Sequence, residues 1–421
     1  MIKNILRHKY LFLITLLFVV YLPFSVGIPA QTNTRAIVTG ISIDKKNDNF
    51  TVALQIITPQ SNISNNENLD IIEDDGITVF DCLNNLSIKL GKEIGLEHTN
   101  IIILSDSIKE EDLMNIFEYM YRNSKITLST ILVYTTGSAK KLLETSAELN
   151  NNSSSSIQNN LGFNSKLFLT ANVVTLGDFF NDYYSFSAIT SMPLISQGVS
   201  GDSQGGQEGS SNTQQSGSNG GVAGASSGGS SNSGSETKVE PLVKNEGKSA
   251  IFKKGKFFDE LSKELVTGFS YLNRKSYKGA IFVENVTDKY YDNSKVSVEI
   301  EKSKIKIKEV YRDNKLCFDV DFKIYCYLSE VINERPKDIK IMYSIENYLT
   351  EALTDKLKEK INDSVQKSLE YTKNQKIDIF QFYEKFYKHD KKSLIKILRQ
   401  YGEDYLDACE INMNILVLPY K

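Results

Sequence analysis

Hydrophobic positions between residues 34 and 150 switch repeatedly between the two-residue period of strands and the 3.6-residue period of helices. Two strands are predicted in residues 34–58, followed by a helix whose inward positions are Val79, Leu83, Leu86 and Leu90. A buried strand at 100–104 comes next, and then a helix whose inward positions are Leu113, Ile116, Phe117 and Met120. The order ends with a β-rich stretch at 126–134 and a helix at 138–147. Strands that alternate with helices in this way predict helices packed on a sheet.

Local signals refine this order. Thr78 is the expected N-cap of the first helix, because a threonine oxygen can accept a free amide of the first turn. Ser107 and Glu110 fit a capping box and predict a helix start there. Residues 60–75 are polar and rich in asparagine, so we expect a loop. Its acidic run, Glu73-Asp74-Asp75, is interpreted as a solvated surface rather than a cation site.

The second half of the chain is dominated by strands and one long helix. Strands are predicted at 248–253, 280–284, 295–307, 316–328 and 409–418. Residues 257–271 are expected to form a helix or a second strand, and a shorter helix is expected at 392–405. A hydrophobic residue recurs every four positions from Ile345 to Leu369, which predicts a long amphipathic helix. Its stripe could bind a partner or a membrane, but the sheet needs a cover, so core packing is favoured. The expected fold class is α+β (mixed α/β), with the long helix packed on an antiparallel sheet.

A low-complexity run lies between these halves. A short helix is expected at 175–180 and an extended stretch at 188–195, after which residues 196–235 are almost entirely Gly, Ser, Asn and Gln. Such a composition buries too little apolar surface to offset the entropy of ordering, so it predicts a flexible loop. A phosphate-binding glycine loop is excluded because no strand-loop-helix frame or Gly-Lys-Ser/Thr motif accompanies it.

The N-terminus has the pattern of an export signal. Lys3, Arg7 and Lys9 precede an apolar run at residues 10–26, which includes Leu11, Leu16, Val20 and Leu22. Cleavage after Gly27 or Ala30 would release a secreted protein. An uncleaved run would be a membrane segment with Asn33 and the following residues outside.

Composition limits the chemistry of the chain. Its 421 residues allow two or three domains, and a formal net charge of −3 without a broad basic excess gives no indication of nucleic acid binding. The four cysteines form no CxxC pair, which disfavours zinc. Cys317 and Cys326 would point to opposite faces of one strand, so they could not form a disulfide with each other. Buried free thiols are the favoured interpretation.

We identify no catalytic, cofactor-binding or metal-binding residue. Beyond the export segment the histidines are His98 and His389, and a serine or cysteine nucleophile would need one of them. His98 at a strand start is interpreted as a hydrogen-bonded turn histidine, and His389 in a polar turn as exposed. Two isolated histidines do not form a multi-histidine metal site.

Several segments together resemble the spore-germination GerAC-like family, the C subunits of germinant receptors in spore-forming bacteria. The residues that carry the resemblance lie at 76–83, 97–104, 119–123 and 137–144, with shorter motifs at 40–44, 175–179, 249–253 and 375–380. The resemblance implies three mixed domains: residues 31–150, 161–280 with 196–235 as an insertion, and 281–421, after a signal or anchor at 1–30. Two features depart from the family, which usually has a lipobox cysteine after the apolar run and a tryptophan near residues 398–402.

The resemblance also implies a function. We expect a non-enzymatic, extracytoplasmic subunit of a germinant-receptor-like membrane complex, on the outer face of the spore inner membrane or the cell membrane. Its expected partners are a polytopic membrane subunit, a companion receptor subunit and the membrane, with no nucleic acid and no cofactor. A single apolar segment cannot form a channel, so a multi-span partner is required. The alternative is a secreted or anchored envelope solute-binding protein or enzyme.

Overall fold

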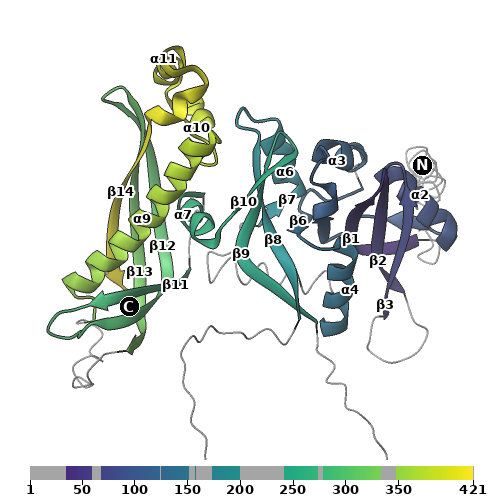
Figure 1. Cartoon of the computed structure of the whole chain (residues 1–421), viewed down its shortest axis with the longest axis horizontal. Coiled ribbons are helices and arrows are strands. Elements are labelled where there is room, and N and C mark those ends of the chain that lie inside the picture. Colours follow the sequence, from purple (N-terminus) through teal and green to yellow (C-terminus); the bar gives the residue numbers. More distant parts are fainter. Residues whose placement is uncertain are drawn as a thin grey trace, which may run out of the picture.

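The computed structural model describes residues 35–58, 68–123, 125–150, 157, 173–199, 241–273, 278–332 and 348–420. These residues form two sheets with helices packed on them, a ten-stranded sheet in the first part of the chain and a four-stranded sheet in the second. The two sheets lie toward opposite ends of the long axis (Figure 1). The mixed α+β class predicted from the sequence is confirmed.

The larger sheet has the order β10-β9-β8-β6-β5-β1-β2-β3, with β4 beside β1 and β7 beside β6. Its strands are β1 (Arg35–Lys46), β2 (Asn49–Thr58), β3 (Asn68–Gly76), β4 (Glu93–Gly95), β5 (Ile101–Ser105), β6 (Ile131–Thr135), β7 (Val174–Thr175), β8 (Ile189–Val199), β9 (Pro241–Lys253) and β10 (Lys256–Leu261). Strands β4 and β5 run parallel to β1, and β6 runs parallel to β5. The expected hairpin of residues 34–58 is present as β1 and β2.

Helices cover both faces of this sheet. The helices are α2 (Val79–Leu90), α3 (Leu113–Arg122), α4 (Ala139–Asn150) and α6 (Leu176–Tyr183). Ile102 and Leu104 of β5 face the core under α2, α3 and α6, whereas Ile101 and Ile103 face the core under α4. A strand buried on both faces reads as a continuous apolar run, and β5 is therefore the buried strand predicted at 100–104.

Helix starts show where local signals succeed and fail. Thr78 caps α2 as predicted, accepting a hydrogen bond from the Asp81 amide at 3.1 Å. The capping box at Ser107 is wrong, because the Ser107 hydroxyl instead accepts the Lys45 amide at 2.7 Å. Ser107 lies in the short 3₁₀ helix η2 (Asp106–Ile108), and α3 is capped by Asp112. A competing tertiary hydrogen bond thus moves the start of α3 down the chain.

Two sequence predictions about loops need correction. Residues 68–75, predicted as part of a loop, belong to β3, the outermost strand, while 60–67 lie outside the described residues. Charged residues are common on edge strands because they discourage pairing with other chains. The acidic composition of this segment therefore led to the prediction of a loop instead of a strand. Strand β8 also continues through Ser196 to Val199, which pair with Lys244 to Pro241. The remainder of the predicted flexible run lies outside the described residues.

The smaller sheet has the order β11-β12-β13-β14. Its strands are β11 (Gly279–Val286), β12 (Ser294–Arg312), β13 (Lys315–Ile332) and β14 (Cys409–Pro419). The first three strands pair antiparallel as predicted, and β14 joins β13 in parallel. A parallel neighbour requires a long crossover, which here consists of the helices between β13 and β14.

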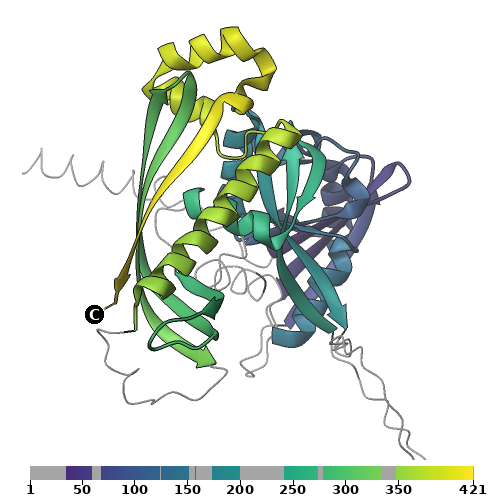
Figure 2. The same cartoon turned by 60° about the vertical axis from the view of Figure 1, so that its left-hand side comes forward.

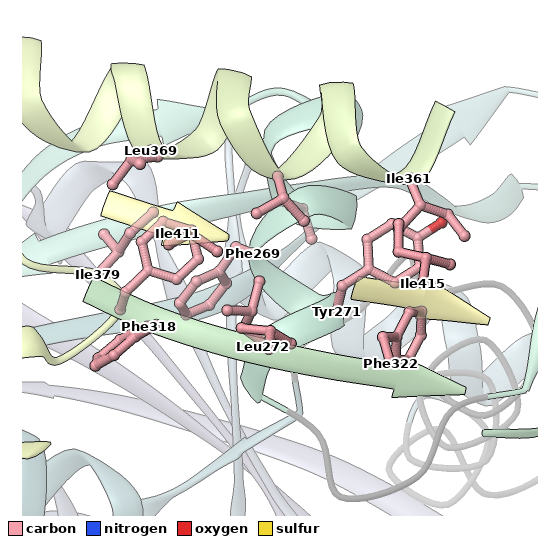
Figure 3. Close-up of a cluster of buried hydrophobic side chains, with 14 of the residues drawn as sticks. Phe269, Tyr271, Leu272, Phe318, Phe322, Ile361, Leu369, Ile379, Ile411 and Ile415 are labelled. Atoms are coloured by element: carbon pink, nitrogen blue, oxygen red, sulfur yellow. The ribbon is translucent and has the colours of Figure 1, made fainter. Parts of the chain in front are cut away.

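The long predicted helix is α9 (Glu351–Gln375), which runs across this sheet (Figure 2). Thr350 caps it, so Leu349 precedes the helix, and Ile345 lies outside the described residues. Its stripe is buried against the sheet and against α7 (Lys263–Asn273), as predicted; it consists of Leu353, Leu357, Ile361, Val365 and Leu369. Figure 3 shows Ile361 and Leu369 above Phe318 and Phe322 of β13.

The crossover ends in two short helices and a 3₁₀ segment. These are α10 (Phe382–His389), α11 (Lys391–Tyr401) and η3 (Gly402–Ala408). The helix predicted at 392–405 is therefore α11, and its last four residues are in η3, because Gly402 has a φ of 59° and ends the α-helix. Helix α10 was not predicted from the sequence.

The boundaries at 31–150, 161–280 and 281–421 remain a prediction. Strands β8, β9 and β10 from the predicted middle domain join β6 in the larger sheet. Helix α7, also from that stretch, packs in the core of the smaller sheet, where the Ser368 hydroxyl donates to the Leu265 carbonyl at 2.9 Å. Residues of the predicted middle domain thus contribute to both bodies of the molecule.

Candidate functional site at the junction of the two sheets

The histidines that the sequence analysis weighed do not form a shared site. His98 is exposed in the turn between β4 and β5, and His389 is the exposed last residue of α10. His389 is exposed as predicted, and His98 lies in a turn as predicted, while its expected hydrogen bond stays a prediction. Among the described residues, no group of three His, Cys, Asp or Glu side chains is arranged to hold a metal ion.

All four cysteines are buried free thiols, as predicted from the sequence. Burial raises the pKa of Cys82 and that of Cys326 to about 12. Burial likewise raises the pKa of Cys409 well above its ordinary value. A thiol that stays protonated is a weak nucleophile, so these residues act as small apolar side chains.

The predicted membrane segment with Leu11, Leu16, Val20 and Leu22 lies outside the described residues. Within the described ranges, no helix has both the length and the apolar character needed to cross a bilayer.

Polar chemistry is instead concentrated where the two bodies meet. We call this region the junction. It is defined by Phe186 and Ser187 in the loop after α6 and Lys253 of β9 on one side, and by Lys376, Asp378, Tyr383 and Glu384 at the end of α9 and in α10 on the other. The Ser187 amide donates to Glu384 Oε1 at 2.8 Å, and its hydroxyl donates to Glu384 Oε2 at 2.6 Å. The Phe186 ring stacks on Tyr383 with centroids 3.5 Å apart. These contacts fasten the loop after α6 to helix α10.

Asp378 organises the second side of the junction. Helix α9 ends at Lys376, which has a φ of 53°, and the chain then turns so that Asp378 precedes α10. Asp378 is only 4% exposed and accepts the amides of Phe382 and Tyr383, each at 2.9 Å. Its carboxylate therefore satisfies the free amides at the start of α10.

The Asp378 carboxylate has further partners. Tyr405 donates its hydroxyl to Asp378 Oδ2 at 2.8 Å, and Ser187 approaches the same oxygen at 3.5 Å. Burial raises the pKa of Asp378, while the two amides and Tyr405 oppose that rise by hydrogen bonding. Burial and the neighbouring Asp378 charge also raise the pKa of Tyr405. Asp378 thus ties α10, η3 and the Ser187 loop together through one side chain.

A pocket of about 380 Å³ opens beside the junction. Asp178 and Asp182 of α6 line it on one side, and Gln381 and Lys385 line it on the other. Burial raises the pKa of Asp182 to about 7, with the nearby Asp178 charge adding to the effect and a hydrogen bond from Thr190 opposing it. The pocket therefore contains a carboxyl group that changes charge near neutral pH.

Lys385 provides the opposite charge in this pocket. Its ammonium donates to the Phe380 carbonyl at 2.9 Å and lies 4.9 Å from the centroid of the Phe318 ring. Burial lowers the pKa of Lys385, although the charges of Asp378, Glu309 and Glu384 act in the other direction. The two bodies thus contribute opposite charges to one space of a size that suits a small ligand.

A second pocket of about 600 Å³ lies at the same junction. Lys253, Lys254 and Lys376 line it together with Phe186 and Tyr405. The Lys253 ammonium donates to the Lys376 carbonyl at 3.3 Å, which adds a direct bond between the two bodies. The junction is therefore a set of polar and aromatic contacts flanked by two open spaces.

Comparison with known proteins gives two family models that match consecutive parts of the chain. The model described as “Spore germination protein N-terminal domain” matches residues 30–197. The model described as “Spore germination B3/ GerAC like, C-terminal” matches residues 247–417. The interval between them, residues 198–246, includes all but the first two residues of the low-complexity run.

Individual proteins are more distant. The chain is 22% identical over 191 residues to the “Putative spore germination protein YfkR” of Bacillus subtilis (strain 168), a match that spans 43% of this chain and 48% of the relative. The chain thus matches about half the length of that relative. A solved structure, “Crystal Structure of the GerBC protein”, is 15% identical with a TM-score of 0.48, and the alignment covers 91% of this chain and 97% of that one.

Proposed function

Because this chain belongs to the GerAC-like family of spore germination proteins, we propose that it is a non-enzymatic, extracytoplasmic subunit of a germinant-receptor membrane complex. It would be needed for nutrient-triggered spore germination. The observation that carries the proposal is the pair of family matches in the correct order, which together span most of the chain. The export signal at residues 1–30 is consistent with a position outside the cytoplasm.

The contacts at the junction support a non-enzymatic role. Both Asp378 oxygens accept backbone amides, and the Ser187 amide and hydroxyl both donate to Glu384. These side chains use their hydrogen-bonding capacity to fix α10 and to hold the two bodies together. A connector of this kind suits a subunit that holds and gates its partners.

We expect the partners to be a polytopic membrane subunit and a companion receptor subunit, at the outer face of the spore inner membrane or of the cell membrane. The sequence has no lipobox cysteine between Phe18 and Ala30, so attachment would depend on an uncleaved run at residues 10–26. The mass of the mature N-terminus measures this directly. A mature protein that starts at Ile28 or Gln31 would contradict the anchor.

Gene deletion tests the proposal. Loss of this protein should abolish or slow nutrient-triggered germination while sporulation proceeds normally. Complementation with His98→Ala or His389→Ala should restore germination, because both side chains are exposed and neither is among the residues that define the junction. Spores that lack the protein yet germinate normally would refute the proposal.

The alternative is an envelope solute-binding protein or enzyme, and the pocket between Asp182 and Lys385 is the observation that favours it. The same strains separate the two. A folded histidine variant that fails to complement would favour a histidine-dependent enzyme. Co-purification with a multi-span protein from spore inner membrane would favour the receptor subunit.

A further inference from the structure

One edge of the larger sheet collects the beginnings of several strands. Strands β1 and β4 run parallel and start level with each other, with Arg35 opposite Glu93. Ion pairs join the segments there, from Arg35 Nε to Glu93 at 3.2 Å and from Lys125 to Glu93 at 2.6 Å. We call this region the N-terminal edge, defined by Arg35, Ile88, Lys92, Glu93, Arg122, Lys125 and Leu128.

Two large apolar side chains are exposed on this edge. Ile88, in the last turn of α2, is 72% exposed, and its carbonyl accepts the Gly91 amide just before β4. Leu128, in the segment before β6, is 59% exposed, and its carbonyl accepts the Gly177 amide at 2.9 Å. Single exposed apolar residues are common on protein surfaces, so exposure alone assigns no role.

Basic residues lie close to these two side chains along the chain. Lys125 is held by Glu93, Arg122 is paired with Glu118 one helical turn away, and Lys92 lies between Ile88 and Glu93 in the chain. Apolar side chains flanked by lysine and arginine are typical of surfaces that lie in the headgroup region of a bilayer.

The length of the chain before β1 restricts where this edge can be. This step rests on the proposed function, in which the apolar run at residues 10–26 stays in the membrane. Residues 27–34 connect that run to Arg35, and the nine steps from Val26 to Arg35 span at most about 32 Å even when fully extended. Arg35 is therefore tethered within this distance of the bilayer. The four-stranded sheet lies toward the other end of the long axis (Figure 1).

We propose that the N-terminal edge is the surface of this protein that rests on the membrane. Ile88 and Leu128 lie at the level of the headgroups, and Lys92, Arg122 and Lys125 face anionic phosphate groups. Glu93 and Glu118 hold two of these cations in place. The short tether and the composition of the edge thus place the larger sheet, rather than the smaller one, against the membrane.

The sequence contains no tryptophan, so a single introduced indole reports on one position. We would compare the full-length variants Leu128→Trp and Ile88→Trp with Leu416→Trp, whose parent side chain on β14 is 43% exposed. Each is reconstituted into vesicles of phosphatidylglycerol and phosphatidylcholine, with or without brominated acyl chains. We expect the two edge reporters to lose emission in brominated vesicles and to shift to shorter wavelength. The β14 reporter should do neither.

The outcomes separate this inference from the proposed function. If the protein floats with the vesicles but the edge reporters are not quenched, the proposed membrane contact of the N-terminal edge is refuted and the proposed N-terminal anchor is retained. Protein that fails to float overturns both, because the edge needs the tether. A combined Lys92→Gln, Arg122→Gln and Lys125→Gln variant should reduce the quenching of the Leu128→Trp reporter in anionic vesicles, with circular dichroism unchanged. Equal quenching in that variant would show that the cations do not contribute.

Discussion

Asp182 makes the stability of the protein depend on pH in a defined direction. The unfolded chain titrates near the ordinary carboxyl value of 3.8, whereas the folded protein titrates at about 7. Below about pH 4 the carboxyl is protonated in both states, so its burial does not change the free energy of unfolding with pH. As the pH rises toward 7, the unfolded chain releases its proton freely, but the folded protein must either keep the proton or bury a charge. The free energy of unfolding therefore falls across this interval.

The size of the effect follows from the two pKa values. Each pH unit between them is worth about 1.36 kcal/mol, so the whole interval is worth about 4 kcal/mol at most. Asp182→Asn removes the titration and keeps an oxygen that can accept the Thr190 hydroxyl. We expect this variant to gain stability relative to the wild type as the pH rises from 4 to 7.5, approaching about 4 kcal/mol at the upper end.

Urea unfolding of the full chain in detergent, at pH 4.5, 5.5, 6.5 and 7.5, measures this difference. Asp313→Asn is the matched control, because Asp313 is an exposed carboxylate in the β12–β13 turn with a φ of 50° that asparagine also tolerates. The control should follow the wild type at every pH. A difference between wild type and Asp182→Asn that is constant with pH would refute the reasoning, since it would mean that Asp182 titrates alike in both states.

Three further predictions concern packing. Gly268→Ala should destabilise the protein by about 1–3 kcal/mol or more in the same urea assay, because a Cβ there would lie 1.9 Å from the Ser364 carbonyl oxygen. Its control is Gly137→Ala, where a Cβ would enter open space, and this variant should change stability by less than about 0.5 kcal/mol. Leu357→Ala, which empties a fully buried position under α9, should cost about 2–5 kcal/mol, and a loss below about 1 kcal/mol would contradict the core assignment. The four cysteines should react slowly with a thiol reagent in the folded protein and rapidly in urea; fast native labelling of Cys82 or Cys409 would contradict their burial.

Much of the fold could be predicted because its signals are local. The apolar stripe at every fourth residue of α9 and the unbroken apolar run of β5 each follow from one stretch of sequence. Strand β3 escaped prediction because its edge position is set by pairing with β2, and its acidic residues carry a loop-like composition. The start of α3 escaped for a similar reason, since Ser107 bonds to Lys45, 62 residues earlier in the chain.

The junction could not be predicted from the sequence, because its chemistry depends on residues far apart in the chain. The 375–380 motif carried part of the family resemblance, but nothing local shows that Asp378 is buried or that Tyr405 donates to it. Ser187 and Glu384 are separated by 197 residues, and each is unremarkable in its own segment. Asp182 likewise has its raised pKa mainly because it is buried, with the charge of Asp178 and, last, that of Glu384 adding to the effect. Asp182 also shares its pocket with Ile379 and Lys385 of the second body, so separating the bodies should lower its pKa to the extent that they bury it, and that change would measure their contribution.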